Sequence, residues 1–423
     1  MERQIQLDRH ARPSGVRDDK IKMTLPLIIY RSLRQHALST IITAGSIALA
    51  CGLLMCVWMV KTQSQAAFMQ TTTGFDAVLG ARGSKLQLVL NAIFHLEASP
   101  GNVAAADFEA VRKNPMVKTA IPIAVGDNLR GFRLVGTVPE LFTTVELVPG
   151  KKFAVQAGGK IFNADAKEAV AGSFAAQRLG LKVGDTFRPF HGLAFDAKAE
   201  HADDFTVTGI LAPTNTPADR VVWIPLRGLQ TMSGHDAKTA TDVSAVLLQL
   251  RTPMAGLMLD TLYNKQGNRL TFAYPVGAIV AELFGKIAWF DQVLTLVAYL
   301  VALVAAGSVL TSIYNSMSAR RRDLAILRAL GAKRRTIFGA VLAEAACIGA
   351  LGAVAGFAVY FGLYAGVASI VRAQTGVVLE IGAQHPVLWV CPLAMIALCA
   401  LGGIVPALKA YRTPVAETLA PVS

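Results

Sequence analysis

The stretch ALSTIITAGSIALACGLLMCVWMV, residues 37–60, contains no charged residue. A hydrocarbon core about 30 Å thick is crossed by a helix of about 20 apolar residues, which satisfies its own backbone hydrogen bonds. Three further apolar stretches, at 292–314, 337–370 and 387–408, are long enough to do the same. We therefore expect an α-helical membrane protein with four transmembrane helices. A large domain, residues 61–286, would be inserted between the first and the second, and we call it the inserted domain.

The composition agrees with a membrane protein that carries one sizeable water-facing domain. Of the 423 residues, 53% are hydrophobic and only 16% are charged, and the mean hydropathy is +0.46. The formal net charge of +13 would fit nucleic-acid binding if it were spread over the inserted domain. Basic residues instead concentrate beside the apolar stretches, which argues against a nucleic-acid partner.

The position of the basic residues predicts the orientation of the chain. They cluster in three segments: 1–36, 315–336 and 409–423. The positive-inside rule places these segments in the cytoplasm and the inserted domain on the outer side, with both termini cytoplasmic. Aromatic residues, which prefer the membrane interface, fall at the expected outer ends of the spans: Trp58, Trp289, Phe290, Tyr360, Tyr364 and Trp389.

The chain before the second span carries two further signals. The first apolar stretch and the region before it are longer than those of a cleaved secretory signal, so we expect a retained helix. In residues 25–36, apolar positions recur every three or four residues, with Arg31 and Arg34 on the opposite side. This pattern is typical of an amphipathic helix on the inner membrane surface, and a simple extension of the first span is the alternative.

The inserted domain reads as mixed α/β, in one unit or two lobes. We expect helices at 103–114 and 171–179, the second ending at Gly180, strands at 130–137, 205–210, 221–225 and 243–250, and a loop at 214–219. No cysteine falls in this domain, so it has no disulfide to stabilise it. The five cysteines lie in the spans and are expected to be small apolar fillers: Cys51, Cys56, Cys347, Cys391 and Cys399.

The sequence offers no catalytic constellation, no bound cofactor and no metal site. The ATP-binding pattern GxxxxGK followed by Ser or Thr is absent, and so are HExxH and GxSxG. The histidines make no recognisable pair with a carboxylate or a cysteine and are expected to be lone surface residues: His10, His36, His95, His191, His201, His235 and His385. We therefore expect a protein that is not an enzyme.

Two features of the spans concern packing. Glu344 is the one acid well inside a span. It is expected to belong to a polar contact between helices, with substrate or proton movement as the alternative. Small residues four apart, as in Gly352-x₃-Gly356 and Gly362-x₃-Gly366, allow close helix approach, either within the chain or between two subunits. We expect a dimer, because four spans are few for a translocation route.

The segment 316–332, SMSARRRDLAILRALGA, predicts a short cytoplasmic helix that ends at Gly331. Leu324, Ile326, Leu327 and Leu330 share one side at helical spacing, and arginines occupy the other. The positive-inside rule accounts for the arginines. It does not account for the ordered apolar side or for the glycine.

Here the chain resembles the MacB/FtsX-like permeases of ABC transporters, also called mechanotransmission permeases. The first similarity is RRDLAILRALGA at 321–332, and the second is the tail, PALKA at 406–410 with TPVAETL at 413–419. The third is a series of short motifs in the inserted domain: GKKF at 150–153, VAG at 170–172, LGL at 179–181, GD at 184–185 and VTGIL at 207–211. With the one-plus-three layout of spans, the resemblance extends over most of the chain beyond residue 24.

The resemblance implies coupling rather than catalysis. A separate ATPase subunit, which would carry ATP and Mg, would bind the cytoplasmic helix through Arg321, Arg322, Asp323, Leu324, Leu327, Arg328, Leu330 and Gly331. It also implies a bacterial plasma (inner) membrane, a second copy of this chain or a related permease, and a periplasmic adaptor or lipoprotein as a further partner. No ATPase domain precedes the first span, so we expect the ATPase on its own chain.

Three classes of function remain after this reading. The first is the permease subunit of a transporter that exports or extracts an envelope substrate, such as a drug, a peptide or a lipoprotein. The second is a regulatory transmitter that controls cell-wall hydrolases, like the division-associated members of the family. The third, a membrane-bound enzyme, is disfavoured because the catalytic residues it would need are missing.

Overall fold

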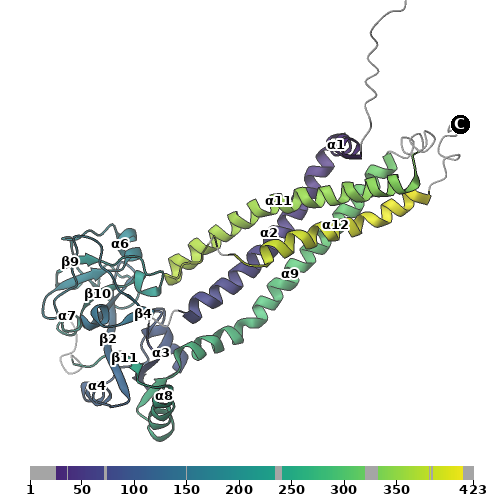
Figure 1. Cartoon of the computed structure of the whole chain (residues 1–423). Coiled ribbons are helices and arrows are strands. Elements are labelled where there is room, and N and C mark those ends of the chain that lie inside the picture. Colours follow the sequence, from purple (N-terminus) through teal and green to yellow (C-terminus); the bar gives the residue numbers. More distant parts are fainter. Residues whose placement is uncertain are drawn as a thin grey trace, which may run out of the picture. The chain divides into compact units, whose positions relative to one another are not determined.

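A computed structural model gives the arrangement of the elements along the chain (Figure 1). It describes residues 25–35, 37–70, 74–148, 150–233, 241–319, 332–380, 382 and 384–412. The segment predicted to bind the ATPase, from Arg321 to Gly331, lies outside the described residues. So do most of the predicted N-terminal region and nearly all of the predicted tail.

Four long helices contain the four apolar stretches. They are α2 (Ala37–Gln70), α9 (Val276–Ala319), α11 (Arg334–Thr375) and α12 (Val387–Arg412). The parts long and apolar enough to cross a membrane are Ala37–Ala67, Ala288–Asn315, Arg334–Thr375 and Val387–Leu408. The predicted end of the inserted domain, residue 286, therefore falls inside α9, because no proline interrupts the helix between Val276 and the span.

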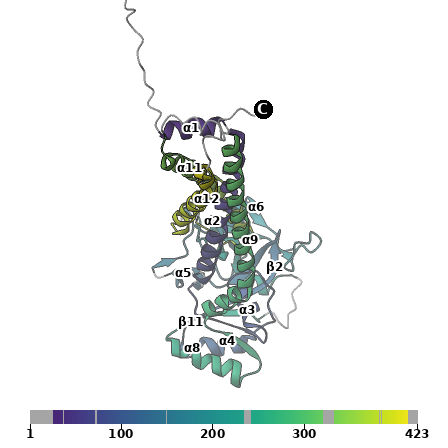
Figure 2. The ribbon, with the colours of Figure 1, turned by 90° about the vertical axis from the view of Figure 1, so that its right-hand side faces the viewer.

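The amphipathic segment forms a helix of its own, α1 (Leu25–Gln35). Figure 2 shows α1 turned across the direction in which α2 begins, so it is not a straight continuation of that helix. Tyr30 is exposed, whereas Ser32 is only 3% exposed. The change of direction argues against a simple extension of the first span.

The described chain divides into two compact units. One contains the residues up to Ile47 together with Leu303–Ala355 and the chain from Leu393 onward. The other contains Ala48–Ala302 and Gly356–Pro392, and so includes the whole inserted domain. Each long helix contributes to both units.

Glycines allow close helix packing inside each unit. In the first, a Cβ added to Gly352 would lie 2.6 Å from the Cβ of Ile47. In the second, a Cβ added to Gly356 would lie 3.0 Å from the Cβ of Cys51. The Gly352-x₃-Gly356 pair therefore packs within the chain, since both glycines admit a neighbouring helix that a larger residue would push away.

The inserted domain is built on one sheet with the strand order β12-β1-β11-β2-β3-β10-β6-β9-β7, and β8 pairs with β2. The strands are β1 (Ala77–Ala81), β2 (Val117–Leu129), β3 (Phe132–Thr137), β6 (Glu168–Ala171), β7 (Thr186–Phe187), β8 (Phe190–His191), β9 (Phe205–Ile210), β10 (Val222–Pro225), β11 (Ala245–Leu250) and β12 (Leu270–Ala273). A separate hairpin consists of β4 (Glu146–Val148) and β5 (Lys151–Lys152).

Short helices accompany this sheet (Figure 1). They are α3 (Lys85–Ala92), α4 (Ala105–Arg112), α5 (Glu140–Thr143), α6 (Ser173–Leu179), α7 (Leu226–Gln230) and α8 (Pro253–Asp260), with the 3₁₀ turn η1 (Pro217–Arg220) and the π-helical turn η2 (Thr261–Gln266). The two parallel pairs, β3 with β10 and β6 with β9, occur within an otherwise antiparallel arrangement. The mixed α/β character expected from the sequence is confirmed.

The long strand β2 joins the two parts of the sheet. Its first part pairs with β11, where Ile121 lies opposite Leu247, and its second part pairs with β3, where Val125 lies opposite Val135. Apolar side chains from both parts meet in one core cluster that includes Ile121 and Trp223. Two further clusters pack around Phe205 and Phe272. The domain therefore has several cores on a continuous sheet rather than two separate lobes.

Most predicted elements of this domain are present. The helix at 173–179 ends at Gly180, whose φ of 69° is the left-handed conformation that favours glycine at a helix end. The strand at 205–210 has the predicted bounds, whereas residues 217–219 of the predicted loop at 214–219 form most of η1. The strands β1, β2, β4, β5, β6, β7, β8 and β12 were not predicted.

Candidate functional site

On the side predicted to be cytoplasmic, the described part of the chain contains one of the predicted site residues, Glu344. Its carboxylate accepts a hydrogen bond from the hydroxyl of Ser32, which joins α11 to α1. Glu344 is half-buried, and Ser32 is buried. This contact favours a helix-packing role for Glu344, because a hydroxyl partner lowers the cost of a carboxylate in an apolar bundle. The other predicted site residues, at 321–331, lie outside the described chain.

The beginning of α9 is embedded in the inserted domain. Only Tyr274 and Pro275 separate it from β12, and the amide of Val276 donates to the carbonyl of Asp76 at 3.1 Å. Val276 and Val280 are 1% and 2% exposed and belong to the core cluster that includes Ile121 and Trp223. Each buried aliphatic side chain of this size contributes about 1.5–3 kcal/mol. A displacement of this end of α9 must therefore displace the core around it.

The far end of α11 is attached to the same domain at a second point. The guanidinium of Arg220, at the end of η1, donates to the backbone carbonyl of Gln374. The guanidinium carbon of Arg372 lies 5.4 Å from the ring centre of Phe174, the second residue of α6. The chain leaves α11 at Gly376, whose φ is 77° and whose added Cβ would lie 2.9 Å from the side chain of Arg220. The helix end is therefore fixed by a charge-assisted hydrogen bond, a cation–π contact and close packing.

Arg220 borders a cavity of about 400 Å³ with a cationic lining. Arg133 and His95 also line it, together with Phe132 and Gln374. Burial lowers the pKa values of Arg133 and Arg220. Burial, and then the charge of Arg133, lowers the pKa of His95 to about 3, so this imidazole is neutral at physiological pH. The ring of His95 stands edge-on to Trp223 with 5.4 Å between the ring centres.

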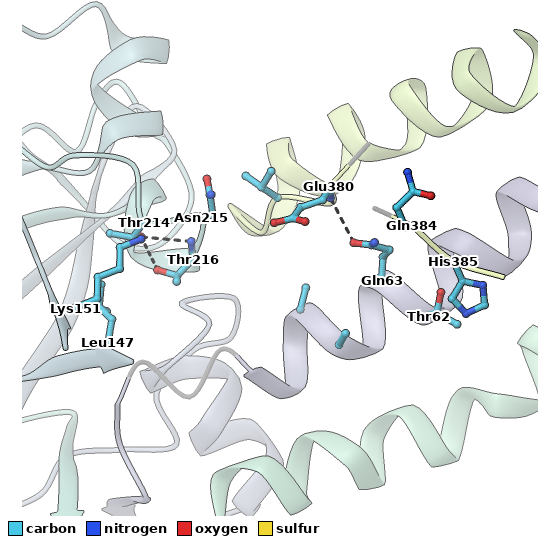
Figure 3. Close-up of a pocket in the computed structure, with 13 residues that line it drawn as sticks. Thr62, Gln63, Leu147, Lys151, Thr214, Asn215, Thr216, Glu380, Gln384 and His385 are labelled. Carbon is cyan, nitrogen blue, oxygen red and sulfur yellow. Dashed lines mark hydrogen bonds between the residues drawn. The ribbon is translucent and has the colours of Figure 1, made fainter. Parts of the chain in front are cut away.

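A second cavity of about 480 Å³ lies where four segments of the same unit come together. Figure 3 shows Gln63 on α2, Lys151 on β5, Thr214 in the loop before η1, and Glu380 and His385 in the connection from α11 to α12. The amide of Glu380 donates to the side-chain oxygen of Gln63 at 3.4 Å.

The loop at 214–216, which lines this cavity, is held by hydrogen bonds to the carboxylate of Asp219, a residue that is 3% exposed. Its carboxylate accepts hydrogen bonds from the amide and hydroxyl of Thr214, at 3.0 and 2.7 Å, and from the amide of Asn215 at 2.9 Å. The cavity thus has a polar wall of fixed geometry. Hydroxyl, amide and isolated charged groups can bind a ligand, but the lining residues contain no arrangement of nucleophile and base that would react with one.

The expectation of lone surface histidines is wrong for His201. This residue is 7% exposed, and its ring lies against that of His191 with 5.5 Å between the ring centres. Sequence reasoning also missed Arg220, Gln374 and Gln63. The groups that these residues contact lie far away along the chain, so local sequence patterns do not reveal them. The one hint in the sequence was that Arg220 directly follows the predicted loop.

Two family models match the chain. The model of the MacB-like periplasmic core domain matches residues 40–255, which is just over half of the chain. The model of the FtsX-like permease C-terminal region matches residues 295–415. No curated protein matches the chain.

Two solved structures are similar to parts of it. The periplasmic region of MacB from Actinobacillus actinomycetemcomitans matches over 50% of this chain and 94% of its own length, at 11% identity and a TM-score of 0.33. The extracellular domain of the noncanonic ABC-type transporter YknZ from Gram-positive bacteria matches over 46% of this chain and 97% of its own length, at 16% identity and a TM-score of 0.28.

Proposed function

The chain belongs to the MacB/FtsX-like ABC transporter permeases, and we propose that it transmits the ATP-driven movement of a separate ATPase to its inserted domain. In this proposal, α9 and α11 act as levers. Movement of the inserted domain then exports or extracts an envelope substrate on the outer side of the membrane.

The observation that carries the proposal is the attachment of both helices to the inserted domain. The 44 residues of α9 would extend about 66 Å at 1.5 Å per residue, roughly twice the thickness of a hydrocarbon core. Its first turns lie in the core of the domain, and the end of α11 is bound by Arg220. A continuous helix transmits displacement along its axis because its backbone hydrogen bonds resist local bending.

The ATPase would bind through the predicted coupling helix, whose contact residues are Arg321, Arg322, Asp323, Leu324, Leu327, Arg328, Leu330 and Gly331. The ATPase would hold ATP and Mg. A second copy of the chain would bring a second ATPase into reach. Gly362 and Gly366 support such a pairing, because no atom lies within 4 Å of a Cβ added at either position.

The cavity bordered by Gln63 and Glu380 supports handling of a substrate. Its volume of about 480 Å³ falls in the range of ligand sites, and polar side chains surround it. A chain that only relays a signal to a cell-wall hydrolase has no need of such a cavity. We therefore favour export or extraction, with regulation of hydrolases as the alternative.

Co-purification with a separate ABC ATPase subunit from the same genome tests the proposal. We expect Leu327→Asp and Arg328→Glu to abolish association and the stimulation of ATP hydrolysis. Arg335→Glu is the matched control, because it makes the same charge change at an exposed position outside the predicted contact. Association that survives both changes would overturn the coupling surface.

Cross-linking from the inserted domain separates the two functions. Position 151, an exposed residue at the cavity, is a suitable site for a photoreactive amino acid. Capture of a lipoprotein or a periplasmic adaptor supports transport, whereas capture of a cell-wall hydrolase supports regulation.

A further inference from the structure

Three metal-ligating side chains converge in the inserted domain. They are Asp127 on β2, His191 on β8 and His201 in the segment that follows. One carboxylate oxygen of Asp127 lies 3.2 Å from Nδ1 of His191 and 3.2 Å from Nε2 of His201. All the ligating atoms lie within 4.8 Å of one another.

The backbone brings these residues together. Asp127 lies directly opposite His191 in the antiparallel pairing of β2 with β8. The amide of His191 donates to the carbonyl of Ala199 at 2.7 Å, and the amide of His201 donates to that of Pro189 at 2.9 Å. The two histidines therefore sit on paired segments, one of which runs antiparallel to the end of β2.

Asn128, which is fully buried, fixes the turn between the two histidines. Its side-chain amide donates to the carbonyls of Phe190, Gly192 and Ala194 at 3.3, 2.9 and 3.1 Å. The positions of the ligating groups are therefore set by strand pairing and by a buried amide before any ion binds. Such preorganisation is what a functional metal site requires.

A backbone carbonyl determines which nitrogen of His201 faces the carboxylate. Nδ1 lies 2.7 Å from the carbonyl oxygen of Ser233, which can only accept, so Nδ1 carries the proton. In the neutral ring, Nε2 then presents a lone pair to an oxygen of Asp127 that is itself electron-rich. This arrangement requires a proton or a metal ion between the two atoms. Metal-ligating histidines commonly donate their second ring N–H to a backbone carbonyl in this way.

The carbonyl of Ser233 is in turn held in place. The carboxylate of Asp203 accepts hydrogen bonds from the amide and the hydroxyl of Ser233 at 2.8 and 2.7 Å. Asp203 also pairs with Lys167. A chain of contacts therefore runs from a surface ion pair to the ring of His201.

We propose that Asp127, His191 and His201 form a binding site for a divalent transition-metal ion of the zinc class. Two ligand atoms about 2.0–2.1 Å from a tetrahedral Zn²⁺ lie about 3.3–3.4 Å apart, close to both distances from the carboxylate oxygen. Two imidazoles and one carboxylate select such ions over Mg²⁺ and Ca²⁺, which prefer oxygen ligands.

Exposure defines how the ion is held. The side chain of Asp127 is fully buried and that of His201 is 5% exposed, whereas that of His191 is 62% exposed. The ion therefore enters and leaves from the solvent-exposed side of the site, where His191 lies. Water or an exogenous ligand takes the fourth coordination position. This site is independent of the proposed lever function, because none of its residues takes part in the attachments of α9 or α11.

The test is Zn²⁺ binding to the full-length chain in lipid nanodiscs, prepared with an affinity tag that contains no histidine. Isothermal titration calorimetry should show one Zn²⁺ per chain and no binding of Mg²⁺. We expect His191→Gln and Asp127→Asn each to lower the affinity more than about tenfold, since even outer-shell changes cost 10–100-fold. His385→Gln, a histidine change far from the cluster in sequence, should leave it unchanged.

Substitution with Co²⁺ provides the second readout. A tetrahedral Co²⁺ site gives intense visible absorption that His191→Gln should abolish, and circular dichroism verifies that this surface variant is folded. Absence of stoichiometric Zn²⁺ binding by the unmodified chain would overturn the proposal. Binding that His191→Gln and Asp127→Asn leave intact would overturn it equally.

Discussion

Replacement of Arg220 by methionine tests whether the end of α11 is held by the inserted domain. The change keeps an apolar stem but removes the guanidinium that binds the carbonyl of Gln374. A hydrogen bond to a charged group is worth about 1.5–3 kcal/mol. The guanidinium also lies 5.7 Å from the ring centre of Phe132, and part of this contact would be lost with it.

Hydrogen–deuterium exchange at the end of α11 measures this loss. The amide of Gly376 donates to the carbonyl of Arg372 at 2.9 Å and that of Val377 to the hydroxyl of Thr375 at 3.2 Å, so both are protected while the helix end is closed. A loss of about 1.5–3 kcal/mol raises the population of the open state, and therefore the exchange rate, about 10–150-fold, since 1.4 kcal/mol is a factor of ten.

The control is Arg227→Met in the same domain. Arg227 pairs with Asp165, and both side chains are well exposed, so this ion pair contributes little. Its loss should leave exchange at Gly376 unchanged. If Arg220→Met also leaves exchange at Gly376 and Val377 within about twofold of the unmodified chain, the attachment of α11 through Arg220 is refuted.

Further predictions concern the core and the bundle. The pKa of His95 is about 3 in the folded chain against an ordinary 6.5, so the unfolded chain binds the proton first. The free energy of unfolding should therefore fall as the pH drops from about 6.5 towards 3, by up to about 1.4 kcal/mol per pH unit. In urea unfolding measured over this pH range, the free energy of unfolding of His95→Gln should depend less on pH than that of the unmodified chain. Ile279→Ala at the buried start of α9 should lower the stability of the inserted domain by about 2–5 kcal/mol in urea unfolding, whereas the exposed Leu294→Ala should not. Ser32→Ala should lower the thermal stability of the full chain in nanodiscs, because it removes the hydrogen bond from Ser32 to Glu344. A melting temperature equal to that of the unmodified chain would contradict a stabilising role for this hydrogen bond.

The sequence predicted the membrane-spanning architecture because a single local property determines it. Each span is a long, predominantly apolar run, and the helix at 173–179 carries its own stop signal in Gly180. The position of α1 was equally local, since its apolar and basic residues alternate at helical spacing. The lengths of α2 and α9 were underestimated because hydropathy marks where lipid ends and not where a helix ends.

The elements that were missed depend on contacts between distant residues. Pro122 and Gly126 divide β2 into segments that look like loop by composition, yet pairing with β11 and β3 keeps the strand continuous. His201 contacts Asp127 across 74 positions, and Arg220 contacts Gln374 across 154. No spacing rule connects residues that far apart, so the histidine cluster and the attachment of α11 emerge only from the fold.

The most direct test of the lever mechanism is hydrogen–deuterium exchange of the complete permease–ATPase complex in nanodiscs, with and without ATP trapped on the ATPase. The lever mechanism predicts that ATP changes the exchange of the loop at 214–216 and of the amides of Gly376 and Val377. It also predicts that Arg220→Met abolishes the change at 214–216 while the ATPase stays bound. Exchange in the inserted domain that is identical with and without trapped ATP would rule this mechanism out.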